Sequence, residues 1–294
     1  MKLLARSGWV LVLAAWAAPL RAQGDAWAEA IRPVAPGRIA DDLYYVGTAD
    51  LAVYLFTSPA GHVLLDAGPV ESVAHVLEAI RRVGFKPGDV RLLINSHGHF
   101  DHAGGLAELK RRTGARLAVS EPEAALIARG GRGDFGLGDG AAYPAAAADR
   151  VLRDGDTVRA GPRLLTAHLT PGHTRGCTTW TTAVRDGARS YRVAFICSLS
   201  VLSMYRLTGR ESYPGILADY RRSIGVVRGL PCEIMLAPHT SFIRDFHGKL
   251  ARIRSSGSVE ALVDPTACRR YADRAEQNLE AHLAEERRGT ARPH

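Results

Sequence analysis

Short apolar runs separated by turn residues fill the first part of the chain and predict consecutive β-strands. These runs are Leu43–Gly47, Ala52–Thr57 and His62–Leu65. Ser58-Pro59-Ala60-Gly61, just before the last run, has the residue types of a hairpin turn. Val70–Val83 instead carries apolar residues at helical spacing and is followed by Gly84, where a helix would end. The pattern therefore starts as a β-meander and continues with a helix.

Strands and helices alternate along the rest of the chain. Further strands are expected at Arg91–Asn95, Leu117–Ser120, near Val151 and Val158, and at Arg163–Leu169, Cys177–Val184, Tyr191–Ile196 and Glu233–Ala237. Further helices are expected at Leu106–Arg112, Glu121–Ala128, Ile216–Val227 and Thr266–Arg288. Gly130–Ala148 has no clear period and predicts a long surface loop, a kind of segment that is often functional. Two halves in which strands precede helices predict an α/β fold with two sheets face to face and helices outside them.

The N-terminus has the pattern of a secretory signal peptide. Met1–Arg6 is short and basic, Gly8–Leu20 is almost wholly apolar, and Leu20-Arg21-Ala22 suits a signal peptidase. The apolar run is about 13 residues long, against the roughly 20 that a membrane anchor needs. We therefore predict a signal peptide at residues 1–22 and a single mature domain at residues 23–294, exported to the periplasm or secreted.

Composition and charge narrow the classes of partner. The 294 residues are 46% hydrophobic and 23% charged, as in ordinary globular proteins. Removal of Lys2, Arg6 and Arg21 with the signal peptide lowers the formal charge from +8 to +5. This mildly basic, mixed surface does not predict nucleic-acid binding. No later stretch is long and apolar enough to span a bilayer, so we expect a protein without membrane association after signal removal. No sequence feature determines the oligomeric state, and a monomer is expected.

A cluster of histidines and an aspartate follows the predicted strand Arg91–Asn95. His97, His99, Asp101 and His102 lie within six residues, on a loop that leads into the next helix. Imidazole nitrogens and a carboxylate oxygen are ligands that suit zinc. His97 and His99 are two residues apart, so an extended loop points both to one side. Asp101 and His102 are displaced along the chain and can begin a second site.

Two distant histidines have similar settings at the ends of strands. His173 lies in the turn Thr170-Pro171-Gly172-His173-Thr174, where Pro and Gly fix the backbone. His239 follows the predicted strand Glu233–Ala237. The remaining histidines lack such settings and are interpreted as ordinary residues: His62, His75, His168, His247, His282 and His294.

These motifs resemble those of the metallo-β-lactamase superfamily. The resemblance rests on the run His97–His102, the turn around His173, the strand-end His239 and the segment Leu64-Leu65-Asp66-Ala67-Gly68, and it covers nearly the whole stretch 43–239. It implies a four-layer αββα sandwich, with two mixed sheets and zinc at their edge. Four further segments resemble the third subclass of the zinc β-lactamases: Gly172–Trp180, Cys197–Ser200, Ala237–Thr240 and Asp245–Leu250.

The resemblance implies two Zn²⁺ ions and a specific set of ligands. The first ion would be held by His97, His99 and His173, and the second by Asp101, His102 and His239. The implied activity is hydrolysis of the amide bond in penicillins, cephalosporins and carbapenems by a zinc-bound hydroxide, which confers antibiotic resistance. Asp101 would be the catalytic residue that orients this hydroxide, with no covalent enzyme intermediate.

The resemblance also implies contacts to a small β-lactam substrate. Ser198 and Ser200 would lie near the second zinc ion and the substrate carboxylate, and Tyr205 and Thr240 are further candidates. The Tyr205 phenol would lie near the substrate carbonyl. Preference among β-lactams is expected to depend on the loops Gly47–Leu51 and Gly130–Pro144.

Three alternatives stay open from the sequence. An exported thioesterase or lactonase of this superfamily would have the same fold, but related thioesterases place a bridging aspartate where this chain has Cys197 and Ser198. The first two β-lactamase subclasses use a cysteine ligand in this region, which keeps Cys197 as an alternative ligand. A non-catalytic zinc protein would need saturated ions, whereas three ligands for each ion leave a coordination position open.

The four cysteines permit two disulfides in an exported protein. Cys232 and Cys268 stand where the resembled subclass has its disulfide. Cys177 and Cys197 are equidistant from Gly187 in a predicted hairpin turn, so a regular hairpin would place them opposite each other. Whether they are bonded is open; a bulge or an off-centre turn would separate them, and we expect two buried free thiols.

Overall fold

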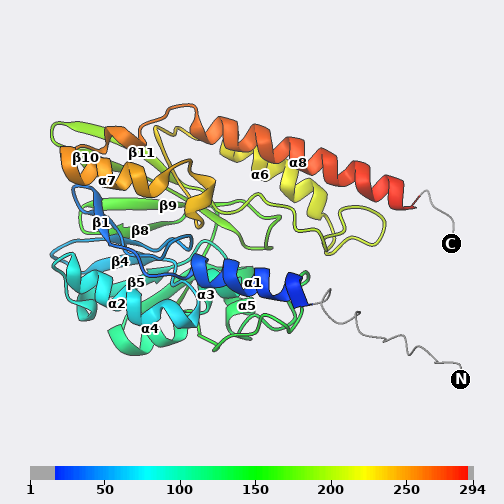
Figure 1. Cartoon of the computed structure of the whole chain (residues 1–294), viewed down its shortest axis with the longest axis horizontal. Helices are drawn as coiled ribbons and strands as arrows, with labels where there is room; N and C mark the ends of the chain where they lie inside the picture. Colours follow the sequence, from blue (N-terminus) through cyan, green and yellow to red (C-terminus); the bar gives the residue numbers. More distant parts are fainter. Residues whose placement is uncertain (1–16, 291–294) are drawn as a thin grey trace, which may run out of the picture.

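The computed structural model describes residues 17–290, which form two β-sheets between layers of helices (Figure 1). Within this range the first sheet has seven strands in chain order. They are β1 (Gly37–Ala40), β2 (Leu43–Tyr45), β3 (Tyr54–Phe56), β4 (His62–Leu65), β5 (Val90–Ile94), β6 (Arg116–Ser120) and β7 (Arg150–Leu152). β1 to β4 are antiparallel, whereas β4 to β7 run parallel, so the sheet is mixed.

The second sheet has the strand order β12-β11-β10-β9-β8. Its strands are β8 (Thr157–Ala160), β9 (Arg163–Leu169), β10 (Thr178–Asp186), β11 (Arg189–Phe195) and β12 (Ile234–Leu236). β8 to β11 are antiparallel, and β12 joins parallel to β11. Both sheets are therefore mixed, as the sequence-based resemblance implies.

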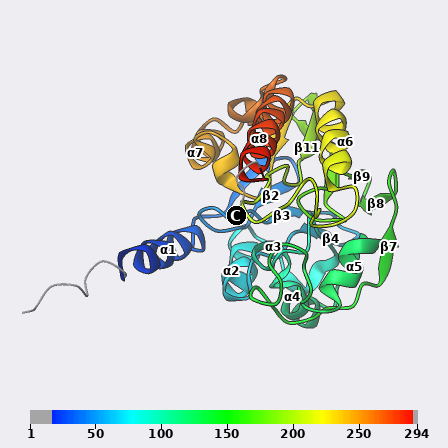
Figure 2. The same cartoon turned by 90° about the vertical axis from the view of Figure 1, so that its right-hand side faces the viewer.

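Helices cover the outer face of each sheet (Figure 2). The first sheet is covered by α2 (Val73–Arg82), α3 (Phe100–Ala103), α4 (Leu106–Thr113) and α5 (Glu121–Ile127). The second sheet is covered by α6 (Ile216–Gly229), α7 (Phe246–Ser256) and α8 (Ala267–Thr290). The chain also contains α1 (Ala17–Ala30) and four short 3-10 helices, at Val70–Ser72, Pro87–Asp89, Thr240–Phe242 and Val259–Leu262.

The core consists of two clusters of apolar side chains, one between the sheets and under the helices of the second sheet, the other under the helices of the first sheet. The division follows from the alternation of side chains along each strand. In β3, Tyr54 and Phe56 face the second sheet, whereas Leu55 faces the outer helices. In β4, Val63 and Leu65 alternate with Leu64 in the same way. These strands are buried on both faces, so they read as continuous apolar runs. The predicted α/β fold, a four-layer αββα sandwich, is confirmed.

Most predicted elements are present, with ends shifted by up to three residues. Among the α-helices and strands, four were not predicted: α1, β1, α3 and α7. Of the predicted signal peptide 1–22, residues 1–16 lie outside the described part of the chain. Its remaining residues, 17–22, lie in α1. Within residues 17–290, none of the helices has the length and apolar character needed to cross a membrane.

Candidate metal centre

All six predicted metal-ligating residues meet at one edge of the sandwich. His97 and His99 lie on the loop after β5, and Asp101 and His102 lie in α3, directly after that loop. His173 lies in the turn between β9 and β10, and His239 follows β12. A main-chain hydrogen bond joins the two sheets at this edge, from the Thr178 N–H to Ser96 O at 2.8 Å.

Asp66, at the end of β4, fixes the start of the loop that carries His97. Its Oδ1 atom accepts hydrogen bonds from Ser96 N at 2.6 Å and from Asn95 Nδ2 at 2.8 Å. Asp66 has a positive φ of 65° and is fully enclosed, and burial raises the pKa of its carboxyl to about 6. The segment Leu64–Gly68, one of the motifs on which the resemblance rests, therefore supports this loop through hydrogen bonds.

The first set of ligands is His97, His99 and His173, with one nitrogen atom of each within 4.8 Å of the others. His173 Nδ1 donates to Ser200 O at 2.8 Å, which leaves Nε2 free to bind a metal ion. Burial lowers the pKa of His99 to about 4 and that of His173 to about 3. These rings are therefore neutral at pH 7, the state that a metal ligand requires.

The second set is Asp101, His102 and His239, whose ligand atoms converge closely. The Nε2 atoms of His102 and His239 are 3.1 Å apart, and Asp101 Oδ2 lies 3.1 Å and 3.4 Å from them. Burial opposes ionisation of Asp101, but His102 and His239 outweigh it and hold the pKa of Asp101 well below its usual range. A cation at this point would replace a proton between the same three atoms.

The two sets adjoin each other through His97. Its ring centroid lies 4.5 Å from that of His102, and ligand atoms of His97, Asp101 and His102 also fall within 4.8 Å of one another. The imidazole nitrogens and the one ionised carboxylate are donors that fit a borderline-soft divalent ion such as zinc. The residues present therefore fit metal binding in donor type and in placement.

Three acidic residues that the sequence analysis did not select support the ligands. Asp50 Oδ2 lies 2.9 Å from His239 Nδ1, and Asp134 Oδ2 lies 3.8 Å from His99 Nε2. Glu123 is buried behind the first set. Asp50 and Asp134 lie in the two loops that were expected to shape substrate preference, but no local motif distinguishes them from other loop acids.

The four predicted substrate-contact residues differ in whether their hydroxyl groups are exposed and free of hydrogen bonds. Ser200 is partly exposed, and its hydroxyl has no hydrogen-bond partner within residues 17–290. Ser198 is buried, and its Oγ accepts from Ser200 N at 3.1 Å. Thr240 is also buried and donates to Ala49 O at 2.7 Å. Tyr205 is 1% exposed and donates to His173 O at 2.8 Å, so its phenol holds the turn that carries His173.

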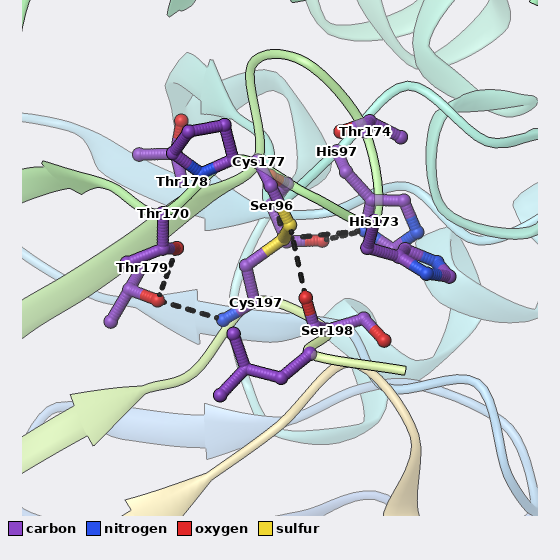
Figure 3. The surroundings of a disulfide bond; sticks show 12 residues. Ser96, His97, Thr170, His173, Thr174, Cys177, Thr178, Thr179, Cys197 and Ser198 are labelled. Carbon is purple, nitrogen blue, oxygen red and sulfur yellow. Dashed lines mark hydrogen bonds between the residues drawn. A yellow bond between two sulfur atoms is a disulfide. The ribbon is translucent and has the colours of Figure 1, made fainter. Parts of the chain in front are cut away.

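Both pairs of cysteines are disulfide-bonded. Cys232–Cys268 joins the segment before β12 to α8, as the resemblance implies. The prediction of free thiols at Cys177 and Cys197 is wrong, because these residues also form a disulfide (Figure 3). The hairpin register is off-centre, with Trp180 opposite Phe195, but the chain leaves the ladder after Phe195 and brings Cys197 to Cys177. Cys197 therefore offers no thiolate to a metal ion, although its Sγ lies 3.7 Å from His97 Nδ1.

Solved structures of subclass B3 metallo-β-lactamases are similar to this chain over most of its length. BJP-1, a subclass B3 enzyme of Bradyrhizobium japonicum, has 33% sequence identity and a TM-score of 0.83. The match covers 90% of this chain and 99% of that chain. The similarity therefore includes both sheets and the edge that carries the ligands.

Curated relatives match a shorter part. A protein of Burkholderia pseudomallei described as a probable metallo-hydrolase is 31% identical over 197 residues, which is 63% of this chain and 66% of that protein. A hydroxyacylglutathione hydrolase of Methylobacterium nodulans is 35% identical over 104 residues, 35% of this chain and 32% of that protein. The chain thus spans about two thirds of the first relative and about one third of the second. The family model described as the metallo-beta-lactamase superfamily matches residues 51–239. With both ligand sets inside or at the end of this match, the chain belongs to the metallo-β-lactamase superfamily.

Proposed function

We propose that this protein is a zinc-dependent β-lactamase that opens the ring amide of penicillins, cephalosporins and carbapenems and so confers antibiotic resistance. The observation that carries the proposal is the pair of adjoining ligand sets, in which three histidines lie beside an Asp-His-His set. Both sets lie at the edge of a fold that is similar to subclass B3 enzymes over most of the chain. The proposal further rests on Cys197 and Ser198, which supply no carboxylate where related thioesterases have a bridging aspartate.

The chain would hold two zinc ions through its own side chains. His97, His99 and His173 are the proposed ligands of the first ion, and Asp101, His102 and His239 those of the second. When bound, zinc supplies Lewis acidity, which polarises the lactam carbonyl and brings the pKa of a water molecule towards about 7. Asp50 fixes the His239 ring by accepting from Nδ1, and Ser200 O fixes the His173 ring in the same way.

Asp101 is the proposed catalytic residue. Its low pKa keeps the carboxylate ionised, so it can accept a hydrogen bond from the attacking water and orient it towards the carbonyl carbon. Its side chain is 17% exposed, which leaves it open to the solvent side of the site. No serine or cysteine nucleophile is needed, because the nucleophile comes from water.

Ser200 is the proposed main contact of the substrate carboxylate, since its hydroxyl is both accessible and uncommitted. Ser198 and Thr240 would act mainly by holding the walls of the site. Tyr205 supports the His173 turn, and a direct role of its phenol at the substrate would require that hydrogen bond to break.

The proposed setting is the periplasm or the extracellular space. Residues 1–22 would be a signal peptide, and residues 23–294 a single, monomeric domain that does not bind nucleic acid or membranes. Two disulfides fit an oxidising compartment. One continuous apolar cluster, which reaches from Ile39 in β1 to Leu283 in α8, fits one domain.

The test is hydrolysis of a penicillin and of a carbapenem by the purified mature protein, with a glutathione thioester and a homoserine lactone as competing substrates. We expect turnover of the β-lactams, its loss with a chelator and its return with Zn²⁺. Faster turnover of the thioester or the lactone would support the alternative hydrolase instead, and chelator-resistant turnover would contradict a metal mechanism.

A further inference from the structure

The first turn of α5 packs directly against both segments that carry the first ligand set. Gly98 lies between His97 and His99, and a Cβ atom there would overlap with Oε2 of Glu123. Gly176 follows the His173 turn, and a Cβ atom there would lie 2.7 Å from Cγ of Glu123. The lack of a side chain at both glycines therefore lets the two segments approach Glu123 closely.

Hydrogen bonds connect the same side chain to the His173 turn. Oε1 of Glu123 accepts from Thr174 Oγ1 and, at 3.0 Å, from Gly176 N. Ser120, just before α5, adds a hydrogen bond of 2.7 Å from its Oγ to Gly176 O. Tyr143 also holds the His97–His99 segment, because its hydroxyl donates to Gly98 O at 2.5 Å. Glu123 thus lies between two segments that are far apart in sequence.

We propose that Glu123 is a positioning residue that sets the spacing between His97 and His99 on one side and His173 on the other. The inference rests on the proposed metal centre and extends it to a residue that touches neither ion nor substrate. Side-chain nitrogens must be placed within a few tenths of an ångström for metal binding. A carboxyl group that is 2% exposed, packed against one segment and hydrogen-bonded to the other, provides this constraint before any ion binds.

Cobalt binding tests the proposal without substrate. The full mature chain with His239→Ala is used as background. This change weakens metal binding at the second ligand set, so the measured Co²⁺ binding comes from the first set. Co²⁺ affinity is measured by chelator competition, and ligand geometry by visible absorption of the bound ion. We expect Glu123→Ala to weaken Co²⁺ binding about 10-fold or more and to change the absorption bands, as loss of a supporting group does in metal sites.

Two further variants separate positioning from general stability. Glu123→Gln keeps the volume and the Oε1 acceptor, so it is expected to bind Co²⁺ within about threefold of the background. Thr174→Val removes one donor and is expected to weaken binding by an intermediate factor. Glu121→Ala, an exposed carboxyl two residues away on α5, is the matched control and should change neither readout.

The outcomes are distinct. Background-like affinity and spectrum in Glu123→Ala, even with a lower melting temperature, would overturn the proposal and leave a purely structural role. If Glu123→Ala does not fold, Thr174→Val decides, and unchanged binding in that variant overturns the proposal equally. Failure of the parent protein to hydrolyse β-lactams, with these cobalt results intact, would contradict the proposed substrate class and leave the role of Glu123 supported.

Discussion

The Nδ1 atom of His239 lies 2.9 Å from the Oδ2 atom of Asp50, a residue 189 positions earlier in the chain. Burial opposes the charge on Asp50, but His239 and the Ser241 N–H outweigh it and lower the pKa of Asp50. The same contact, together with Asp101, raises the pKa of His239 to about 9 against the effect of burial. Asp50 therefore determines which nitrogen of His239 faces the metal centre.

Asp50→Ala should weaken binding at the second metal site. Loss of the acceptor frees the His239 ring to rotate, and the expected decrease in affinity is about 10- to 100-fold. Zn²⁺ titration with chelator competition measures it. Asp41→Ala, at an exposed carboxyl on the turn between β1 and β2, is the control. Equal zinc affinity in Asp50→Ala and the parent protein would show that His239 is oriented by other contacts.

Tyr205→Phe should lower the free energy of unfolding without changing KM for the substrate. The change leaves buried His173 O without its donor, which costs about 1–2 kcal/mol of unfolding free energy. Denaturant unfolding measures this loss, and steady-state kinetics measure KM. Tyr44→Phe is a suitable comparison, since the Tyr44 hydroxyl makes no hydrogen bond within residues 17–290. A raised KM with unchanged stability would restore Tyr205 as a substrate contact.

Ser200→Ala should raise KM more than it lowers kcat. A hydroxyl that binds the substrate carboxylate equally in the ground state and the transition state contributes to KM alone. The kinetic constants for one penicillin measure the effect, with Ser190→Ala, at an exposed site on β11, as the control. A pure decrease in kcat would contradict a carboxylate-binding role.

Glu123 predicts a specific pH dependence of stability in the chelator-treated protein. Burial raises the pKa of Glu123 to about 7, from a usual value of 4.5. The folded protein therefore binds this proton more tightly than the unfolded chain does. Protonated Glu123 therefore contributes its full share of the unfolding free energy below pH 4.5, and this contribution is lost as the pH rises through 7.

Glu123→Gln cannot ionise, so its stability relative to the parent should rise by about 3 kcal/mol between pH 4.5 and pH 8. Urea unfolding across this range measures the difference between the two proteins. Comparing variants cancels the titration of the buried histidines, which both share. Glu121→Gln should run parallel to the parent, and a parallel curve for Glu123→Gln would mean that Glu123 ionises normally.

Thiol titration of the denatured protein without reductant should find no free thiol, because both cysteine pairs are bonded. Full reduction should then release four. Two free thiols before reduction would show that Cys177–Cys197 is open in solution, and Cys232→Ser/Cys268→Ser identifies which pair is affected.

The sequence predicts those features whose signal is local. The ligands His97 to His102 are recognisable because four of them lie within six residues, and the apolar strands because burial on both faces leaves continuous runs. α7 was missed although Phe246, Leu250 and Ile253 have helical spacing, because polar residues surround them.

The supporting acids could not be predicted, because their roles depend on distances across the fold. Asp50, Glu123 and Asp134 have no motif of their own, and they come near the histidine-bearing segments only when the chain folds. The Cys177–Cys197 pairing failed for a related reason. The strand register places the centre of the hairpin half a residue after Gly187. The two sulfur atoms meet because of the path that the chain takes beyond β11.

The six proposed ligands come from both halves of the sandwich, with four on the first sheet's side and His173 and His239 on the second. Each ligand set needs a histidine from the second half, so neither half of the chain can assemble a complete site by itself. Capture of the proposed ions would therefore be thermodynamically linked to docking of the two halves, and the stabilisation would follow the free metal concentration. If zinc is the bound ion, a cell compartment depleted of it would leave this protein both inactive and less resistant to unfolding and degradation.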